Sequence, residues 1–206
     1  MQKAPEAFFS LKNSPAVVWA IAGNDSGGGA GLSADQRAIA AFGLHACPVV
    51  ATVTAQNSVA VTQVEAVSAE LLDAQLAALA ADMPPAAIKT GLLGNAEQVA
   101  VVARWVDRLR QQHPGLPLVV DPVLRASTGQ DLGSDALCQA VRHLLLPRAT
   151  LVTPNRAEAA RLLGLTVPPT ALTATQVPEL AQALQRLGAH SVAVTGGDAA
   201  PTHPGA

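Results

Sequence analysis

The chain has 206 residues, of which 50% are apolar and 14% are charged, and its formal net charge at pH 7 is −2. This composition excludes intrinsic disorder, which needs low hydrophobicity and high net charge, and it offers no basic field for a nucleic acid. Aromatic residues make up only 2%, and no apolar run reaches about 18 residues, so neither a base-stacking surface nor a membrane span is expected.

The beginning of the chain is predicted to be a flexible leader. Residues 1–14 include Lys3, Glu6 and Lys12 and have no long apolar core, which argues against a signal peptide. Residues 15–206 are expected to form one domain. The two cysteines, Cys47 and Cys138, follow no metal-binding or disulfide pattern, which indicates a reduced, cytoplasmic protein.

Apolar runs and helical patterns alternate along the rest of the chain. The runs predict buried strands at 17–22, 48–54, 86–89, 116–120, 149–152 and 191–194. Helices are predicted at 33–42, 69–81, from 95 onward, 134–145, from 153 onward and 178–187. A polar loop is expected after Gln56, a capping box between Asn95 and Gln98, and Pro154 in the first turn of its helix.

Strands that are apolar throughout and separated by helices predict an α/β fold with a mostly parallel central sheet and helices on both faces. In such sheets, ligands bind beyond the carboxyl ends of the strands. The residues that follow the predicted strands are polar and rich in glycine, and they are therefore the candidates for function. They lie at 23–31, 54–57, 90–94, 121–129, 153–158 and 195–198.

The link between the first strand and the first helix contains five glycines between positions 23 and 31. A phosphate-binding P-loop is excluded because no Gly-Lys-Ser/Thr sequence ends it, and a dinucleotide fingerprint is excluded because the last glycine is missing. A loop that simply turns tightly remains open. Asp25 is interpreted as a cap of this turn or of the helix, and Asp35, taken alone, as a solvated acid near the helix start.

Six segments, in order, resemble the hydroxymethylpyrimidine and phosphomethylpyrimidine kinases of thiamine biosynthesis, which belong to the ribokinase-like superfamily. The segment IAGNDSGGGAGLSAD at 21–35 resembles the family's opening IAGSDPSGGAG followed by Asp. The other five are TAQN at 54–57, KTGLL at 89–93, VDPVL at 120–124, TPN with Glu158 at 153–158, and the glycine pair at 196–197. The resemblance implies a ribokinase-like, three-layer fold.

The resemblance also implies a pyrimidine pocket formed by Gly23, Asp35, Gln56, Leu92 and Val123. The amide of Gln56 can pair with a ring nitrogen and the adjacent amino group, and Asp35 can accept from the amine or the hydroxymethyl arm. Leu92 and Val123 would pack on the ring faces. Without the resemblance, Gln56 is better interpreted as an amide that caps a loop.

On the nucleotide side, the resemblance implies that Asn155, Thr195 and Gly197 lie near ATP. It further implies that Asp121 and Glu158 organise Mg²⁺, mainly through water, which suits an ion that dehydrates reluctantly. Two other interpretations stay open. Asn155 and Glu158 can be ordinary residues of a helix start, and Asp121 can brace the turn before Pro122.

The sequence departs from the family pattern at several positions. Thr195 and Ser127 stand where many relatives have lysine, and Leu92 replaces the usual methionine, which conserves volume. The family's catalytic Gly-Thr-Gly-Cys segment does not occur in these 206 residues. An anion hole contributes roughly 100- to 1,000-fold and a general base roughly 100- to 10,000-fold. We therefore expect the 206 residues alone to lack C-terminal elements of the fold and to have little or no kinase activity.

Three functions follow as hypotheses. The first is an ATP- and Mg²⁺-dependent kinase of hydroxymethylpyrimidine and of its monophosphate, and the resemblance implies a homodimer. The second is a non-catalytic pyrimidine-binding or regulatory module, and the third is a pyridoxal or pyridoxine kinase. Binding of the pyrimidine without ATP turnover would favour the second hypothesis, and turnover of pyridoxal in preference to the pyrimidine would favour the third.

Overall fold

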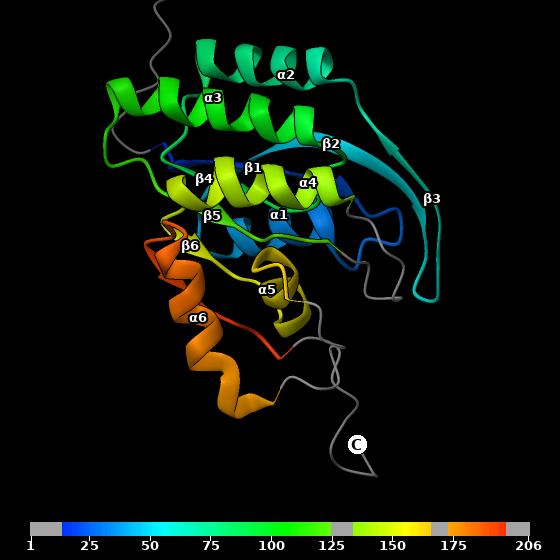
Figure 1. Cartoon of the computed structure of the whole chain (residues 1–206). Helices are drawn as coiled ribbons and strands as arrows, with labels where there is room; N and C mark the ends of the chain where they lie inside the picture. Colours follow the sequence, from blue (N-terminus) through cyan, green and yellow to red (C-terminus); the bar gives the residue numbers. More distant parts are fainter. Residues whose placement is uncertain (1–13, 125–133, 166–172, 197–206) are drawn as a thin grey trace, which may run out of the picture.

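The structure, a computed structural model, describes residues 14–124, 134–165 and 173–196, and its described strands form one sheet (Figure 1). The predicted leader therefore lies outside the described residues, except for Ser14. The strands are β1 (Val17–Asn24), β2 (His45–Gln56), β3 (Val61–Ala66), β4 (Ala87–Thr90), β5 (Leu118–Val120), β6 (Leu151–Val152) and β7 (Ser191–Val192). The helices are α1 (Gly31–Ala41), α2 (Ala69–Asp82), α3 (Ala96–Gln112), α4 (Asp135–Ala140), α5 (Arg156–Leu162) and α6 (Val177–Arg186).

The strand order in the sheet is β3-β2-β1-β4-β5-β6-β7, and every neighbouring pair is parallel except β2 with β3. The chain builds outward from β1 through β2 to β3, and then returns to add β4 on the opposite side of β1. The order thus reverses between β1 and β4. The carboxyl ends of these two strands flank the crevice where α/β sheets of this kind bind their ligands.

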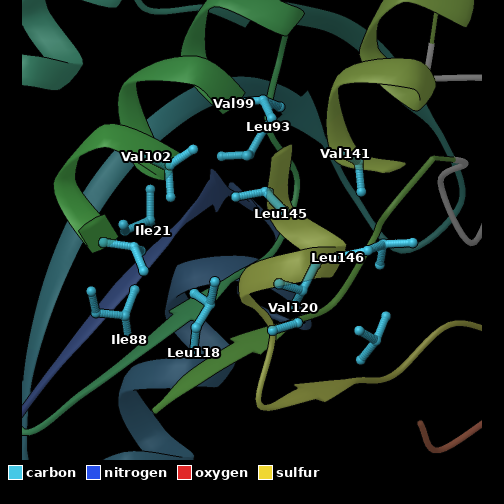
Figure 2. Close-up of a cluster of buried hydrophobic side chains, with 14 of the residues drawn as sticks. Ile21, Ile88, Leu93, Val99, Val102, Leu118, Val120, Val141, Leu145 and Leu146 are labelled. Carbon is cyan, nitrogen blue, oxygen red and sulfur yellow. The ribbon is translucent and has the colours of Figure 1, made fainter. Parts of the chain in front are cut away.

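The larger part of the core lies on one face of the sheet, beneath α2, α3 and α4. Ile21, Ile88, Leu118 and Val120 of three adjacent strands point to this side, where they meet Val99 and Val102 of α3 and Val141 and Leu145 beyond α4 (Figure 2). These strand side chains are at most 1% exposed. Apart from Thr90, the buried side chains of β1, β4 and β5 on this face are apolar, as expected for central strands of a parallel sheet.

The other face is covered by α1, whose Leu32 packs against Ala20 and Ala22 of β1. The prediction of an α/β sheet with helices on both faces is confirmed, but the two faces are unequal. On the α1 side, Val119 and Leu151 are only half-buried, whereas Val120 and Val152 on the opposite side are 1% and 0% exposed. Among the described segments, no helix has both the length and the apolarity that crossing a membrane requires.

The predicted polar loop after Gln56 is wrong, because the chain turns at once and forms the antiparallel edge strand β3. Asn57 makes this turn: its side-chain oxygen accepts hydrogen bonds from the backbone N–H groups of Val59 and Ala60, at 2.9 Å each. Only Val61 of β3 is buried, and Thr62, Gln63 and Glu65 are exposed. An edge strand with so many solvent-facing polar side chains has no continuous apolar run in its sequence.

Two predicted helix starts also need correction. Pro154 precedes α5 instead of lying in its first turn, because Asn155 forms the N-cap and the helix begins at Arg156. Asn95 does cap α3 by accepting from the Gln98 N–H at 2.9 Å, but the Gln98 side chain does not complete the capping box. The helix predicted at 134–145 is α4 followed by a π-helical turn, Val141–Leu145.

A surface ion pair far from the carboxyl edge allows a test of pH dependence. Arg148 donates to both carboxylate oxygens of Asp107, at 2.8 and 2.7 Å, and these hydrogen bonds are the main reason why the pKa of Asp107 is lowered. A carboxylate with a lowered pKa stabilises the folded state above the pKa of the unfolded chain, about 3.9. This contribution is lost as the pH falls through the folded-state value.

We therefore expect Asp107→Asn to destabilise the protein at pH 7 by less than about 1 kcal/mol, since the Asp107 side chain is 51% exposed. The difference between the variant and the parent chain should narrow as the pH falls below about 4. Urea denaturation at pH 7 and pH 3 measures the free energy of unfolding of both chains, and an equal difference between them at the two pH values would contradict the expectation.

Candidate active site at the carboxyl edge of the sheet

The glycine-rich loop is held by Asp25, which is 8% exposed. Its carboxylate accepts hydrogen bonds from the backbone N–H groups of Gly27, Gly29 and Ala30, at 2.8, 2.9 and 2.8 Å. The interpretation of Asp25 as a turn cap is confirmed. The N–H groups that a P-loop would direct at a phosphate are here satisfied by a carboxylate from the chain itself. This loop therefore forms a wall of the site instead of a phosphate cradle.

Gly23, Leu92 and Gln56 lie around this loop, at the ends of three segments. A Cβ on Gly23 would lie 2.5 Å from Thr52 Oγ1 and 3.3 Å from Leu92 Cδ2, so only glycine lets Leu92 approach β1. Gln56 is tied to the loop by Ser26, whose hydroxyl donates to the Gln56 carbonyl at 2.7 Å and accepts from its N–H at 2.8 Å. Among the described residues, the half-buried Gln56 side chain has one hydrogen bond, which its oxygen accepts from the Thr54 hydroxyl at a long 3.4 Å, so its amide retains hydrogen-bonding capacity.

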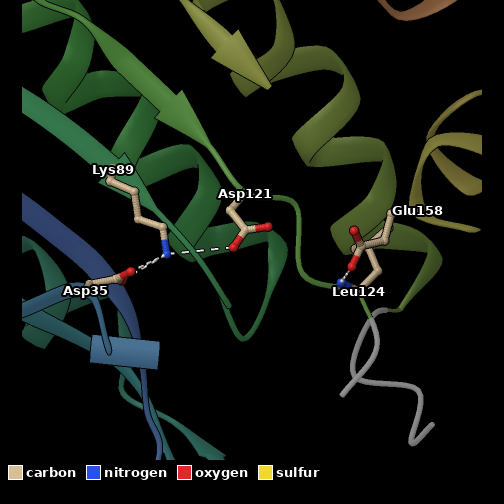
Figure 3. Close-up of polar contacts among 5 residues, drawn as sticks. All are labelled: Asp35, Lys89, Asp121, Leu124 and Glu158. Atoms are coloured by element: carbon tan, nitrogen blue, oxygen red, sulfur yellow. Dashed lines mark hydrogen bonds and ion pairs between the residues drawn. The ribbon is translucent and has the colours of Figure 1, made fainter. Parts of the chain in front are cut away.

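The third feature is an ion cluster that sequence reasoning did not predict. Lys89 of β4 donates to both carboxylate oxygens of Asp35, at 2.8 and 3.0 Å, and its ammonium lies 3.7 Å from the carboxylate of Asp121 (Figure 3). The interpretation of Asp35 as a solvated acid is wrong, because its side chain is 18% exposed and paired. Burial raises the pKa of Asp121, the charge of Asp35 raises it further, and Lys89 opposes both.

Lys89 could have been found from the sequence. A lysine between two apolar positions of a buried strand is rare unless the charge is paired. In the structure its neighbours Ile88 and Thr90 are each 1% exposed on the α3 side, and Lys89 on the other face is paired with a carboxylate. Which carboxylate this is depends on how α1 packs over β1 and β4, and local sequence does not specify that packing.

A small cleft follows the carboxyl ends of β4 and β5. Val123, half-buried, lines it together with Gly91, Leu93, Asp121 and Pro122. Thr90 also lines the cleft, and its buried hydroxyl has no hydrogen-bond partner among the described residues. Leu137 of α4 and Val141 and Leu145 beyond it complete the lining, so this cleft lies on the face of the sheet that α4 covers.

Asn155 and Glu158 belong to the N-terminus of α5, the helix that follows β6. Asn155 Oδ1 accepts from the Glu158 N–H at 2.9 Å, and Glu158 Oε2 accepts from the Asn155 N–H at 2.8 Å, which completes a capping box. Glu158, 6% exposed, also accepts from the Leu124 N–H at 3.4 Å (Figure 3). The helix-start interpretation therefore describes the contacts of both residues, and their roles toward magnesium and nucleotide stay predictions.

Thr195 joins this part of the edge, since it pairs with Asn155 in a parallel bridge and its N–H donates to the Pro154 carbonyl at 2.9 Å. Gly197 and Ser127 lie outside the described residues. Within the described ranges, no three His, Cys, Asp or Glu side chains gather as a metal site. Asp121 and Glu158 come from different elements and could hold Mg²⁺ only with water and phosphate oxygens completing its shell, a mode of binding that is common for this ion.

Together, the sheet order and these side chains define a doubly wound α/β protein with a small-molecule site where the strand order reverses. The chain belongs to the phosphomethylpyrimidine kinase family, whose sequence profile matches residues 25–204. This confirms the resemblance drawn from the six segments.

Relatives and solved structures support the same family. The chain is 41% identical over 182 residues to the hydroxymethylpyrimidine/phosphomethylpyrimidine kinase of Rhizobium meliloti and 40% identical over 183 residues to that of Synechococcus elongatus. These matches cover 88% and 89% of this chain, and they span 65% and 66% of the two relatives.

Among solved structures, the phosphomethylpyrimidine kinase of Clostridium difficile matches with a TM-score of 0.76 and 28% identity, over 90% of this chain and 77% of that one. A pyridoxal kinase of Staphylococcus aureus in complex with pyridoxal also matches with a TM-score of 0.76, at 26% identity, over 91% and 67%. The fold is therefore ribokinase-like, as the resemblance implied.

Proposed function

We propose that this chain provides the substrate-binding part of a kinase that phosphorylates 4-amino-5-hydroxymethyl-2-methylpyrimidine and its monophosphate with ATP. One set of contacts supports the proposal: Leu92 packs against Gly23 at the end of β1, Ser26 binds Gln56 to the adjacent loop, and Asp35 is paired with Lys89 of β4. The names of the relatives supply the reaction, and the site supplies groups that match the substrate.

In this proposal, the amide of Gln56 pairs with the aminopyrimidine edge, because it offers both a donor and an acceptor. Leu92 and Val123 pack on the two faces of the ring, and Asp35 accepts from the hydroxymethyl arm. The arm then points toward Asp121, where the phosphoryl group would arrive.

The nucleotide would lie beyond α5, with Asn155, Thr195 and Gly197 near its phosphates. Asp121 and Glu158 would hold Mg²⁺ through water, and the ion would supply charge neutralisation for the phosphates. A cytoplasmic location and a homodimer belong to the same proposal and are supported by the family alone.

Binding of the free pyrimidine tests the proposal without requiring turnover. We expect the double variant Gln56→Ala/Asp35→Ala to bind hydroxymethylpyrimidine at least about 100-fold more weakly than the parent chain in isothermal titration calorimetry. Each lost hydrogen bond contributes about 1 to 3 kcal/mol, and about 2.7 kcal/mol corresponds to 100-fold.

The matched control is Gln36→Ala, an exposed glutamine adjacent to Asp35 on α1, which should bind the pyrimidine like the parent chain. Undiminished affinity in the double variant would disprove the proposed pocket.

A pyridoxal kinase is the second candidate, because a pyridoxal complex shares the fold at the same TM-score as the pyrimidine kinase structure. Titration with pyridoxal under the same conditions decides between the two. Tighter binding of pyridoxal than of hydroxymethylpyrimidine would change the substrate assignment but keep the site.

A further inference from the structure

Lys89 is a charged residue in the interior of the sheet that no part of the proposed function uses. It lies on β4, paired with Ala20 of β1, and on the face covered by α1. Its ammonium turns toward the carboxyl edge, where it contacts Asp35 from α1 and Asp121 from the segment after β5 (Figure 3). Three separate elements thus converge on one cation.

The local backbone is adapted to this ammonium. Gly91 follows β4 directly, and a Cβ at this position would lie 3.0 Å from Lys89 Nζ and 3.0 Å from the Ala22 Cβ. The missing side chain leaves the space into which the lysine bends. The Lys89 side chain is 23% exposed and that of Asp35 is 18% exposed, so the pair is partly shielded from water and is held more firmly than a surface ion pair.

The charges of the cluster do not cancel. Asp35 and Asp121 are two carboxylates, and Lys89 is the one cation that contacts both in the described part of the chain. When an anionic ligand approaches this edge, the positive charge of Lys89 offsets part of the negative charge of the two carboxylates. If Lys89 were neutral, the ligand would be repelled by both carboxylates. Binding of a neutral alcohol would be weakened much less by the loss of this charge.

We propose that Lys89 is a positioning residue of the pyrimidine site, an inference that rests on the proposed function. Its ammonium fixes the orientation of the Asp35 carboxylate so that the remaining lone pairs accept from the hydroxyl of the substrate arm. Its charge also makes the site tolerant of the phosphate monoester of the same pyrimidine. Lys89 thereby selects a ring that carries a hydroxymethyl or phosphooxymethyl arm over one that carries a methyl group.

The test compares Lys89→Met with the parent 206-residue chain by calorimetry, using three ligands. These are hydroxymethylpyrimidine, its monophosphate, and 4-amino-2,5-dimethylpyrimidine, which lacks the hydroxyl. In the parent chain, we expect the hydroxymethyl compound to bind at least tenfold more tightly than the dimethyl compound. In Lys89→Met this preference should disappear, and the monophosphate should lose at least a further tenfold relative to the alcohol.

A purely structural lysine gives a different result, because all three ligands would then weaken by the same factor. Lys89→Arg retains the charge and should recover part of the preference. If Lys89→Met alone does not fold, Lys89→Gln, a neutral side chain that can still donate to Asp35, replaces it and should keep the preference for the hydroxymethyl compound but weaken binding of the monophosphate. Arg148→Met, which breaks an ion pair at the opposite edge of the sheet, is the matched control and should bind all three ligands like the parent chain.

The outcomes separate the two proposals. A parent chain that binds none of the three pyrimidines overturns the proposed function and this inference with it. A parent chain that prefers the hydroxymethyl compound, together with a Lys89→Met variant that keeps the full preference, overturns the role of Lys89 and leaves the proposed function intact.

Discussion

Gly31→Ala is expected to destabilise the chain by about 3 kcal/mol or more, with urea denaturation as the measurement. Gly31 begins α1 with φ of +54°, in the left-handed region, where an alanine already costs about 1 kcal/mol. In addition, its Cβ would lie 2.4 Å from the carbonyl oxygen of Gly23. No side-chain rotation relieves a contact with backbone, so the joint between β1 and α1 would have to move.

The same loop provides the control. Gly28 also has a positive φ, +73°, but a Cβ there meets nothing within 4 Å. Gly28→Ala should therefore destabilise the chain only by the cost of holding an alanine in the left-handed backbone region, about 1 kcal/mol. The difference between the two variants isolates the contact with Gly23, which is itself a candidate substrate residue. Equal costs would mean that the loop relaxes freely, and that the close approach of α1 to β1 is not needed for the fold.

The buried strands were the part of the fold that the sequence predicted best. Burial on both faces leaves apolar runs such as 17–22, and the polar and glycine-rich residues after them mark the carboxyl edge. From these features alone the functional edge could be placed. The edge strand β3 was missed because its solvent-facing side chains remove the apolar signal, and a hairpin turn around Asn57 lacks the usual Asn-Gly sequence.

The site was harder to predict than the fold, since its contacts join distant segments. Lys89 and Asp35 are separated by 54 positions, and only the register of β1 with β4 and the packing of α1 bring them together. Glu158 shows the converse. The Asn155-x-x-Glu158 spacing is both a family motif and a helix capping box, and the capping geometry accounts for the contacts seen. Sequence spacing alone could not separate those two meanings.

Gln98 is the buried polar residue on which the loop after β4 depends. It is 0% exposed, its side-chain oxygen accepts from the Gly94 N–H at 2.8 Å, and its amide nitrogen donates to the carbonyls of Ala51 and Val67, at 2.8 and 2.7 Å. The side chain thus connects α3, β2 and the segments that precede α2 and α3. The sequence suggested a capping partner for Asn95, whereas the amide instead holds the backbone of Gly94, which ends the segment 91–94 that carries Leu92.

We expect Gln98→Leu to destabilise the chain by about 2 to 5 kcal/mol, because it removes the side-chain partner of the Gly94 N–H and of the Val67 carbonyl, at about 1 to 3 kcal/mol each before relaxation. The Ala51 carbonyl keeps the Val67 N–H as a donor. The matched control is Gln75→Leu on α2. Gln75 bonds both backbone groups of Val50 at 3.0 Å but is only half-buried, so water can replace it and the cost should be about 1 kcal/mol. Urea denaturation compares the two variants.

The consequence for binding is separate from the loss of stability. Leu92 lies beside Gly23 on the segment 91–94, whose last residue is bound by Gln98. A Cβ on Gly94 would lie 2.4 Å from the Ala66 Cβ, so this segment packs tightly against the end of β3. Under conditions where Gln98→Leu remains folded, it should bind hydroxymethylpyrimidine at least about tenfold more weakly, whereas Gln75→Leu should bind it like the parent chain. If both variants lose equal stability and keep full affinity, the segment 91–94 is positioned by its own backbone. The placement of Leu92 then does not depend on the buried amide of Gln98.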